Sequence, residues 1–179
     1  MDERRMVKIS KYLARHLRHS PGRIGLNLDE HGWARVDDLL AAAARHGFPF
    51  TADELEQVVE NNDKRRYAFD DTGGRIRASQ GHSVAVDLEL IPTAPPPVLY
   101  HGTVERSLSA IRREGLRRMN RQAVHLSPDR ATAVRVGARR GRPVVLVVDA
   151  ARMAADGHEF RVSANGVWLV DAVPAEYLS

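Results

Sequence analysis

The sequence predicts an α+β protein built as two lobes, and three observations carry this prediction. Runs of apolar residues with helical spacing come first, and a short alternating hairpin pattern follows them. The prolines of Pro95–Pro97 then favour an extended connector and exclude a helix. After them, short apolar runs between polar turns indicate several strands with two or three small helices. We therefore expect an N-terminal lobe over 1–92, a proline-rich linker over 93–97 and a C-terminal lobe over 98–179.

The first helix is predicted over residues 6–19. Ile9, Leu13 and Leu17 repeat every four residues and form one apolar stripe for the core. The Ser-Pro-Gly sequence of 20–22 ends this helix, because the residue before a proline avoids the helical conformation.

Two further helices and a hairpin are predicted next. Asp37 is expected to cap a helix that runs to about Arg45, and Thr51 and Glu54 have the spacing of a capping box at the start of the following helix. The hairpin then pairs residues 67–69 with 75–78 across a glycine-containing turn. Three helices followed by a hairpin is the winged-helix pattern, so the first lobe is predicted to be winged-helix-like.

In the second lobe, two predicted strands each deliver a histidine to the edge of a polar turn. His101 belongs to the strand over 98–103 and His125 to the strand over 124–127. Gly102 has no Cβ, so the backbone can come close to whatever His101 faces. The two histidines are expected to line one cleft, although two histidines with satisfied hydrogen bonds and no role remain an alternative.

The rest of the second lobe is predicted from apolar spacing and turn residues. A helix with Leu108 and Ile111 ends at Gly115, and Ser127 is expected to cap the next helix. The other expected elements are a helix with Ala131, Val134 and Gly137 on its apolar face, a strand over 144–148 buried on both faces, a helical turn over 150–155 and a hairpin around Asn165-Gly166.

Composition excludes several functional classes. The 179 residues contain no cysteine, which excludes disulfides and cysteine nucleophiles, and no apolar run long enough to span a membrane. The N-terminus has no apolar signal core, so a cytoplasmic location is expected. No P-loop, Rossmann glycine pattern, serine-hydrolase elbow or zinc-protease motif occurs. His16 and His19 share a helix face, but no third metal ligand follows at useful spacing.

Arginine dominates the cationic residues, and the arginines occur in local groups. The net charge is only +4, but a planar guanidinium suits phosphate oxygens, so an anionic partner is expected, either nucleic acid or a phosphorylated cofactor. A solvated arginine-rich surface is the alternative. Histidines and arginines around a phosphate could neutralise charge in a transition state in which the substrate phosphate is the nucleophile.

Five motifs in chain order resemble one enzyme family. They are Leu17-Arg18-His19-Ser20-Pro21, Lys64-Arg65-Arg66-Tyr67, Ile76-Arg77-Ala78-Ser79-Gln80-Gly81-His82-Ser83, Tyr100-His101-Gly102-Thr103 and Met119-Asn120-Arg121-Gln122-Ala123-Val124-His125-Leu126-Ser127. Together they resemble the NAD-dependent RNA 2'-phosphotransferases of tRNA splicing, from about Ile9 to Tyr177.

The resemblance implies both a fold and a reaction. A winged-helix-like lobe would precede an ADP-ribosyltransferase-like mixed-sheet lobe. An internal RNA 2'-phosphate would attack the nicotinamide-bearing ribose carbon of NAD, and the ribose 2''-hydroxyl would then attack the phosphorus. The products would be 2'-hydroxyl RNA, ADP-ribose 1'',2''-cyclic phosphate and nicotinamide, with NAD as co-substrate and no metal. The partners would be RNA and NAD, and a monomer is expected.

The resemblance also assigns roles to residues of this sequence. The implied catalytic residues are Arg18, His19, Arg66 and Arg121. The implied NAD-binding residues are His101, Gly102, Thr103, His125, Ser127 and Arg139, and Arg140 is a less favoured neighbour of Arg139. Possible RNA or phosphate contacts are Gln80, His82 and Ser83, for which packing is the alternative role.

Two other functions stay open at this point. The first is ADP-ribosylation of terminal phosphates on RNA or DNA ends, which would use the same NAD site and stop after the first step. The second is a non-catalytic winged-helix protein that binds nucleic acid and senses NAD.

Overall fold

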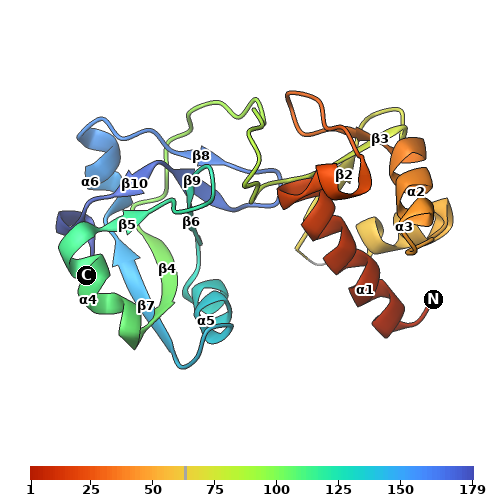
Figure 1. The fold of residues 1–179 in the computed structure, drawn as a ribbon. Helices are drawn as coiled ribbons and strands as arrows, with labels where there is room; N and C mark the ends of the chain where they lie inside the picture. The colour runs from red at the N-terminus through yellow and green to blue at the C-terminus, as the bar shows by residue number, and fades with distance from the viewer. Residues whose placement is uncertain (63) are drawn as a thin grey trace. The chain divides into compact units, whose positions relative to one another are not determined.

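The computed structural model describes residues 1–62 and 64–179, and it is a mixed α+β fold (Figure 1). Within these residues the chain forms two compact units, unit 1 over Met1–Glu89 and unit 2 over Leu90–Ser179. Six α-helices and several small antiparallel sheets lie in the described ranges. None of the helices described there is both long and apolar enough to cross a membrane.

The first helix of unit 1 ends in an unusual turn. Helix α1 (Glu3–Ala14) continues directly into η1 (Arg15–His19), which has the wider π-helical hydrogen bonding. The helix begins three residues before the predicted start, because the Asp2 side chain accepts a hydrogen bond from the Arg5 backbone N–H. The predicted apolar stripe is confirmed, since Ile9, Leu13 and Leu17 are each 0% exposed.

The other helices of unit 1 are α2 (Val36–Arg45) and α3 (Ala52–Glu60), with a short 3-10 helix, η2, at Pro21–Ile24. The prediction that Asp37 caps α2 is wrong. The capping position falls on Arg35, and Asp37 lies in the first turn, where its negative charge faces the positive end of the helix dipole. The capping box of α3 is confirmed by reciprocal hydrogen bonds between Thr51 and Glu54 of 3.0 and 3.1 Å.

A small sheet completes unit 1. Strands β1 (Ala34–Arg35), β3 (Arg75–Ala78) and β2 (Tyr67–Phe69) pair antiparallel in the order β1-β3-β2, as the hairpin pattern predicted for the last two. The Tyr67 hydroxyl donates to the Ser10 carbonyl of α1 at 2.6 Å, so the hairpin is fastened to the first helix. The predicted end of α3 included Asp63, which lies outside the described residues.

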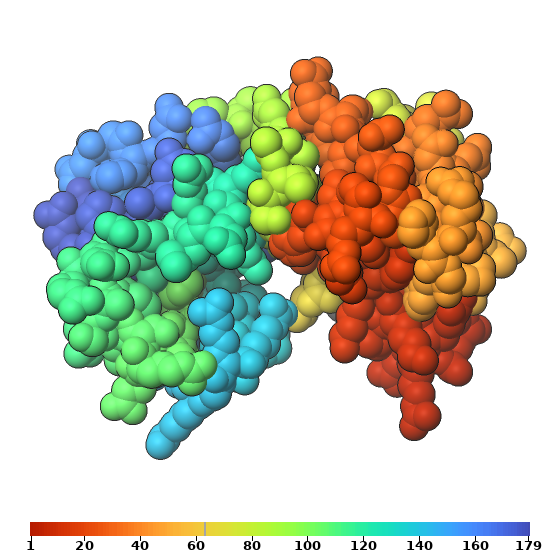
Figure 2. Space-filling model, in the orientation of Figure 1, coloured from red at the N-terminus to blue at the C-terminus, as the bar shows by residue number. Residues whose placement is uncertain are grey.

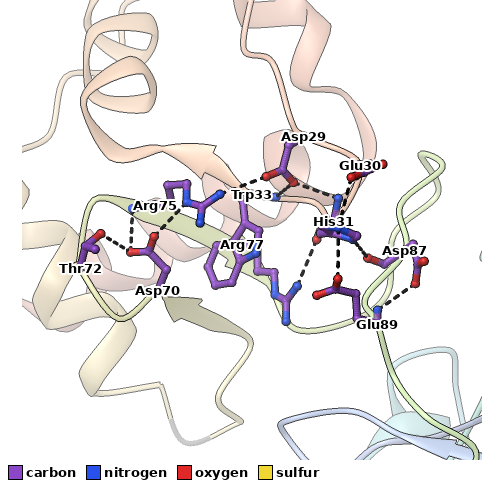
Figure 3. A network of polar contacts seen from close by, with 10 residues as sticks. All are labelled: Asp29, Glu30, His31, Trp33, Asp70, Thr72, Arg75, Arg77, Asp87 and Glu89. Carbon is purple, nitrogen blue, oxygen red and sulfur yellow. Dashed lines mark hydrogen bonds and ion pairs between the residues drawn. The ribbon is translucent and has the colours of Figure 1, made fainter.

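A polar network joins the loop before β1 to the last residues of unit 1 (Figure 3). The ring of His31 lies 3.4 Å from a Glu30 carboxylate oxygen and 3.2 Å from one of Glu89. Its Nδ1 donates to the Asp87 carbonyl at 2.8 Å. This hydrogen bond first, and then the neighbouring carboxylates, raise the pKa of His31. The contacts of this network therefore stabilise the protonated form of His31.

Unit 2 is built on antiparallel strand pairs. Strand β4 (Leu99–Val104) pairs with β7 (Pro143–Val148), and the bridge between Tyr100 and Ser127 ties β4 to the end of β6 (Val124–Leu126). The remaining elements are β5 (Leu116–Arg117) paired with β10 (Ala172–Val173), β8 (Arg161–Val162) and β9 (Trp168–Val170) in the sheet β6-β9-β8, helices α4 (Glu105–Glu114), α5 (Arg130–Ala138) and α6 (Ala150–Ala155), and the 3-10 helix η3 (Ala175–Tyr177).

Three predictions for unit 2 need correction. Ser127 does not cap α5; the Asp129 side chain accepts from the Thr132 N–H at 2.7 Å and begins the helix two residues later. As a result Ala133 faces the core together with the expected Gly137, while Ala131 and Val134 are exposed. Strand β7 is not buried on both faces, since only two of its six residues, Leu146 and Val148, are buried.

Glycine allows α5 to lie directly on strand β4. A Cβ at Gly102 would lie 1.7 Å from the Ala133 carbonyl oxygen, and one at Gly137 would lie 2.8 Å from the Thr103 carbonyl oxygen. Glycine is therefore required at position 102 because α5 packs against it. The sequence instead suggested a close approach of the group that His101 faces as the reason for Gly102. This close packing fixes the strand that carries His101.

Replacement of Gly102 by alanine tests this packing. Because backbone atoms of a helix cannot move aside as a side chain can, Gly102→Ala is expected to lower the free energy of unfolding by about 1–3 kcal/mol or more. Gly22→Ala is the control, since a Cβ there meets nothing within 4 Å. Urea unfolding measures both, and equal stability of the two variants would contradict the assigned contact.

The His31 network predicts a pH dependence with a defined sign. A pKa raised by folding gives stability that is complete below the unfolded value of about 6.5 and is lost as the pH rises through the folded value. His31→Gln is therefore expected to be less stable than the wild type at about pH 5.5, with a smaller difference at about pH 9. Urea unfolding followed by tryptophan fluorescence measures this; a larger difference at the higher pH would have the wrong sign.

Candidate active site

Two of the predicted catalytic arginines share one pocket of unit 1. Arg18 and Arg66 line a cavity of about 180 Å³. The other lining residues come from α1 and are Val7, Ser10, Lys11 and Ala14. Sequence reasoning missed Lys11, although it precedes Arg18 by seven residues and so lies on the same helix face. Three cationic side chains around a small pocket favour an anion.

The backbone beside Arg66 is held by the end of the hairpin. Arg65 adopts a left-handed conformation with φ of 45°, which is unfavourable for a residue with a side chain. Ser79 offsets this by donating twice, from Oγ to the Arg65 carbonyl at 2.9 Å and from its N–H to the Arg66 carbonyl at 2.8 Å. Arg66 is thus placed at the pocket by a fixed turn, while Arg65 is exposed.

His19 follows Arg18 on η1, and both are fastened to the segment that was predicted to contact RNA. The Nδ1 atom of His19 lies 2.9 Å from the Ser83 hydroxyl, and the Arg18 carbonyl accepts from the Ser83 N–H at 2.9 Å. Ser83 and His19 are both exposed at the surface of unit 1.

His82 differs from its neighbour Ser83 because it is buried. It is only 1% exposed, and both ring nitrogens lack a hydrogen-bond partner among the described residues. Burial first, and then the charges of Arg18, His19 and Arg77, lower the pKa of His82 to about 4. A direct contact of its side chain with RNA is therefore not supported. Gln80 is half-buried, and its Oε1 lacks a hydrogen-bond partner within the described ranges.

In unit 2 Arg121 contacts the ring of His125, and His101 contacts the His125 backbone. Arg121 Nη1 donates to His125 Nδ1 at 2.6 Å, which requires a neutral His125 with its proton on Nε2. His101 Nδ1 lies 3.4 Å from the His125 carbonyl oxygen, which can only accept. Burial lowers the pKa of His101, and the charge of Arg140 adds to this effect. The hydrogen bonds thus use Nδ1 of His125 as an acceptor and Nδ1 of His101 as a donor.

Several guanidinium groups of unit 2 gather around Arg121. Desolvation, followed by repulsion from Arg140 and Arg139, lowers the pKa of Arg121. The sequence favoured Arg139 over Arg140 as the residue near NAD, yet Arg140 acts more strongly on Arg121 and also acts on His101. Both arginines are exposed just after α5, a segment that reaches the surface in cyan in Figure 2. Here too the arrangement suits an anion.

The other predicted NAD-binding residues lie on β4 and directly after β6. Thr103 on β4 is only 2% exposed, so its side chain lies in the interior of unit 2. Ser127 exchanges two backbone hydrogen bonds with Tyr100, at 2.9 and 2.8 Å, which sets β4 beside the end of β6. Among the described residues, no group of three or more histidine, aspartate or glutamate side chains could hold a metal ion.

Comparison with known proteins identifies the family. The model of the family "RNA 2'-phosphotransferase, Tpt1 / KptA family" matches residues 4–172. The chain belongs to this family. It is 68% identical over 178 residues to a probable RNA 2'-phosphotransferase of Streptomyces coelicolor, which covers 99% of this chain and 97% of that protein.

More distant members of the family match over the same length. The chain is 57% identical to a probable RNA 2'-phosphotransferase of Trichormus variabilis and 50% identical to one of Flavobacterium johnsoniae, in each case across 99% of this chain and 98% of the relative. These matches confirm the predicted family, an NAD-dependent transferase activity on RNA 2'-phosphates, and NAD as co-substrate.

The buried His82 predicts acid sensitivity with the opposite sign to His31. Folding lowers the pKa of His82 to about 4. Between about pH 6.5 and pH 4, His82 is therefore protonated in the unfolded chain but not in the folded protein. Stability is therefore present above pH 6.5 and falls by up to about 3 kcal/mol as the pH drops towards 4. His82→Asn is expected to flatten this decline in urea unfolding; an unchanged decline would show that His82 protonates freely in the folded protein.

Proposed function

We propose that the chain transfers the RNA 2'-phosphate to NAD through Arg18, His19 and Arg66 of a winged-helix-like lobe and Arg121 of an ADP-ribosyltransferase-like lobe. The lobes have the boundaries predicted from the sequence, with 93–97 as the linker, and the protein acts as a monomer. The main support for this proposal is the pocket lined by Lys11, Arg18 and Arg66. It places three cationic groups around a space that can hold a small anion such as a phosphate group.

In the first step the 2'-phosphate is the nucleophile. One of its oxygens bonds to C1'' of the nicotinamide ribose, the bond from C1'' to the nicotinamide nitrogen breaks, and neutral nicotinamide leaves with the electron pair. Arg18, Arg66 and Arg121 hold the phosphate at the distance and angle this attack requires. The enzyme therefore needs no nucleophile of its own, in agreement with the lack of cysteine.

In the second step the ribose 2''-hydroxyl attacks the phosphorus. The bond between phosphorus and the RNA 2'-oxygen breaks, and the proton lost by the 2''-hydroxyl is balanced by the one gained at the RNA 2'-oxygen. His19 assists this proton movement, while the arginines stabilise the charge that develops on the phosphoryl oxygens. The products are 2'-hydroxyl RNA and ADP-ribose 1'',2''-cyclic phosphate.

NAD is held by residues of unit 2. The proposed set is His101, Gly102, Thr103, His125, Ser127 and Arg139, to which we add Arg140. The hydrogen bond from Arg121 to His125 supports this set, since it links a proposed catalytic group to a proposed NAD-binding strand. Thr103 would take part through its backbone, because its side chain is buried. No metal is part of the proposed mechanism.

A second reaction uses the same groups. ADP-ribosylation of a terminal phosphate ends after the first step, because it leaves ADP-ribose on the nucleic acid. The cationic groups of each unit suit an internal 2'-phosphate and a terminal phosphate equally well. The two reactions are therefore separated by analysis of their products.

Alanine variants test the catalytic set. Arg18→Ala, Arg66→Ala and Arg121→Ala are each expected to lower 2'-phosphate removal by about 100-fold or more, because each loses a charge that stabilises the transition state. Arg112→Ala on the exposed end of α4 is the control and should act as the wild type does. The assay follows nicotinamide and ADP-ribose 1'',2''-cyclic phosphate from NAD and a 2'-phosphorylated oligonucleotide.

Three results would contradict the proposal. Wild-type turnover by any of the three variants would remove that arginine from the mechanism. Loss of wild-type turnover in excess chelator would contradict a reaction without metal. ADP-ribosylated RNA as the final product of the wild type would favour the terminal-phosphate reaction.

A further inference from the structure

We propose that Ser83 is a positioning residue that holds the ring of His19 in the orientation needed for the second chemical step. This inference rests on the role of His19 given under Proposed function. It replaces the expectation that Ser83 contacts RNA or phosphate directly.

Ser83 contacts the end of the first helix at two points. Its hydroxyl lies 2.9 Å from His19 Nδ1, and its N–H donates to the Arg18 carbonyl at 2.9 Å. The next N–H, of Val84, approaches the same carbonyl at 3.4 Å. A residue that is 64 positions away in sequence therefore fixes both the backbone and the side chain of the Arg18-His19 pair.

The π-helical turn explains why an external partner is needed. The last carbonyls of a helix have no donor within the helix itself. In η1 the Ser20 N–H returns to the Arg15 carbonyl at 2.8 Å, and the chain then leaves the helix at Pro21, which has no N–H. The Arg18 carbonyl receives its donor from Ser83, so the position of this turn depends on the segment around residue 83.

The residues before Ser83 fit closely under Arg18. Gly81 has φ of +89°, and a Cβ there would lie 3.4 Å from Arg18 Nε. His82 is buried, and a Cβ on Gly32 would lie 3.3 Å from its Nε2. The backbone of Gly81 and His82 thus packs between the Arg18 side chain and Gly32. This packing restricts the position of Ser83, as is required of a residue that orients another side chain.

The bond to Nδ1 decides which atom of His19 serves the reaction. If the Ser83 hydroxyl donates to Nδ1, His19 carries its proton on Nε2; if it accepts, Nδ1 carries a proton. In both cases the serine occupies Nδ1, so we assign Nε2 as the atom that exchanges a proton with substrate. Without Ser83 the imidazole can rotate about its side-chain bonds, and proton transfer in the second step slows.

Valine and threonine at position 83 provide a matched pair. Both side chains are branched and have nearly the same shape, but only threonine keeps the hydroxyl. Ser83→Val is expected to slow the second step about tenfold or more while nicotinamide release changes less than about threefold, so that 2'-phospho-ADP-ribosylated RNA accumulates. Ser83→Thr is expected to process this intermediate at close to the wild-type rate.

Single-turnover assays with NAD and a 2'-phosphorylated oligonucleotide measure both steps for each variant. Ser83→Ala repeats the test with a smaller side chain, and Ser109→Ala on α4 controls for the loss of an exposed hydroxyl. In a His19→Asn background, Ser83→Val should cause no further loss, because the ring that it orients is gone.

The outcomes separate this inference from the proposed function. If the wild type releases no nicotinamide, or if His19→Asn turns over normally, the proposed function itself fails. If the wild type and His19→Asn behave as proposed, the positioning role is overturned by any of three results: Ser83→Val completes the second step at the wild-type rate, Ser83→Thr is as slow as Ser83→Val, or both steps slow equally.

Discussion

The excess of guanidinium groups over carboxylates around the predicted site residues is the constraint on which this structure depends. Among the described residues, no ion pair with a carboxylate involves Arg66, Arg121, Arg139 or Arg140. Three arginines elsewhere pair with carboxylates: Arg5 with Glu54, Arg75 with Asp29 and Asp70, and Arg161 with Glu159. Like charges that repel one another are costly unless an anion balances them, and a phosphate is the anion that arginine suits best.

The fold keeps these cations in place with backbone contacts rather than with opposite charges. In unit 1, Ser79 fixes the turn before Arg66, and Ser83 fixes the π-helical turn of Arg18. In unit 2, α5 packs on β4 without an intervening side chain at Gly102, which leaves Arg139 and Arg140 just beyond the helix. A carboxylate partner would neutralise the arginines and compete with the substrate, whereas a backbone carbonyl or a serine hydroxyl does not.

The parts of the fold that follow from local patterns could be predicted from the sequence. The stripe of Ile9, Leu13 and Leu17, the capping box at Thr51 and the two histidine-bearing strands depend on residues close to one another in the chain. The predicted cap of α5 was wrong because Ser127 and Asp129 are both residue types that cap helices well. The choice between them depends on how the helix packs on β4, which no local pattern shows.

The sequence proposes residues for the site but gives none of their contacts. The family motifs pointed to Arg18, His19, Arg66 and Arg121, but no local pattern indicates that η1 is π-helical or that Ser83 reaches His19. Lys11 was missed because a lysine on an exposed helix face is usually solvated, and only the hairpin that brings Arg66 beside α1 turns that face into a pocket. For His82 the sequence left open both an RNA or phosphate contact and a packing role, because its burial beside Gly32 depends on residues far apart in the chain.

Equilibrium binding of RNA without NAD tests most directly whether the cations of unit 1 hold the 2'-phosphate. Two oligonucleotides of one sequence, with a 2'-phosphate or a 2'-hydroxyl at one position, are titrated against the wild type and against Arg18→Gln and Arg66→Gln at one fixed salt concentration. The wild type should bind the 2'-phosphorylated RNA about tenfold or more tightly than its partner, and each variant should lose most of that preference. Equal binding of the two RNAs by the wild type, or a preference that both variants keep, would contradict the account.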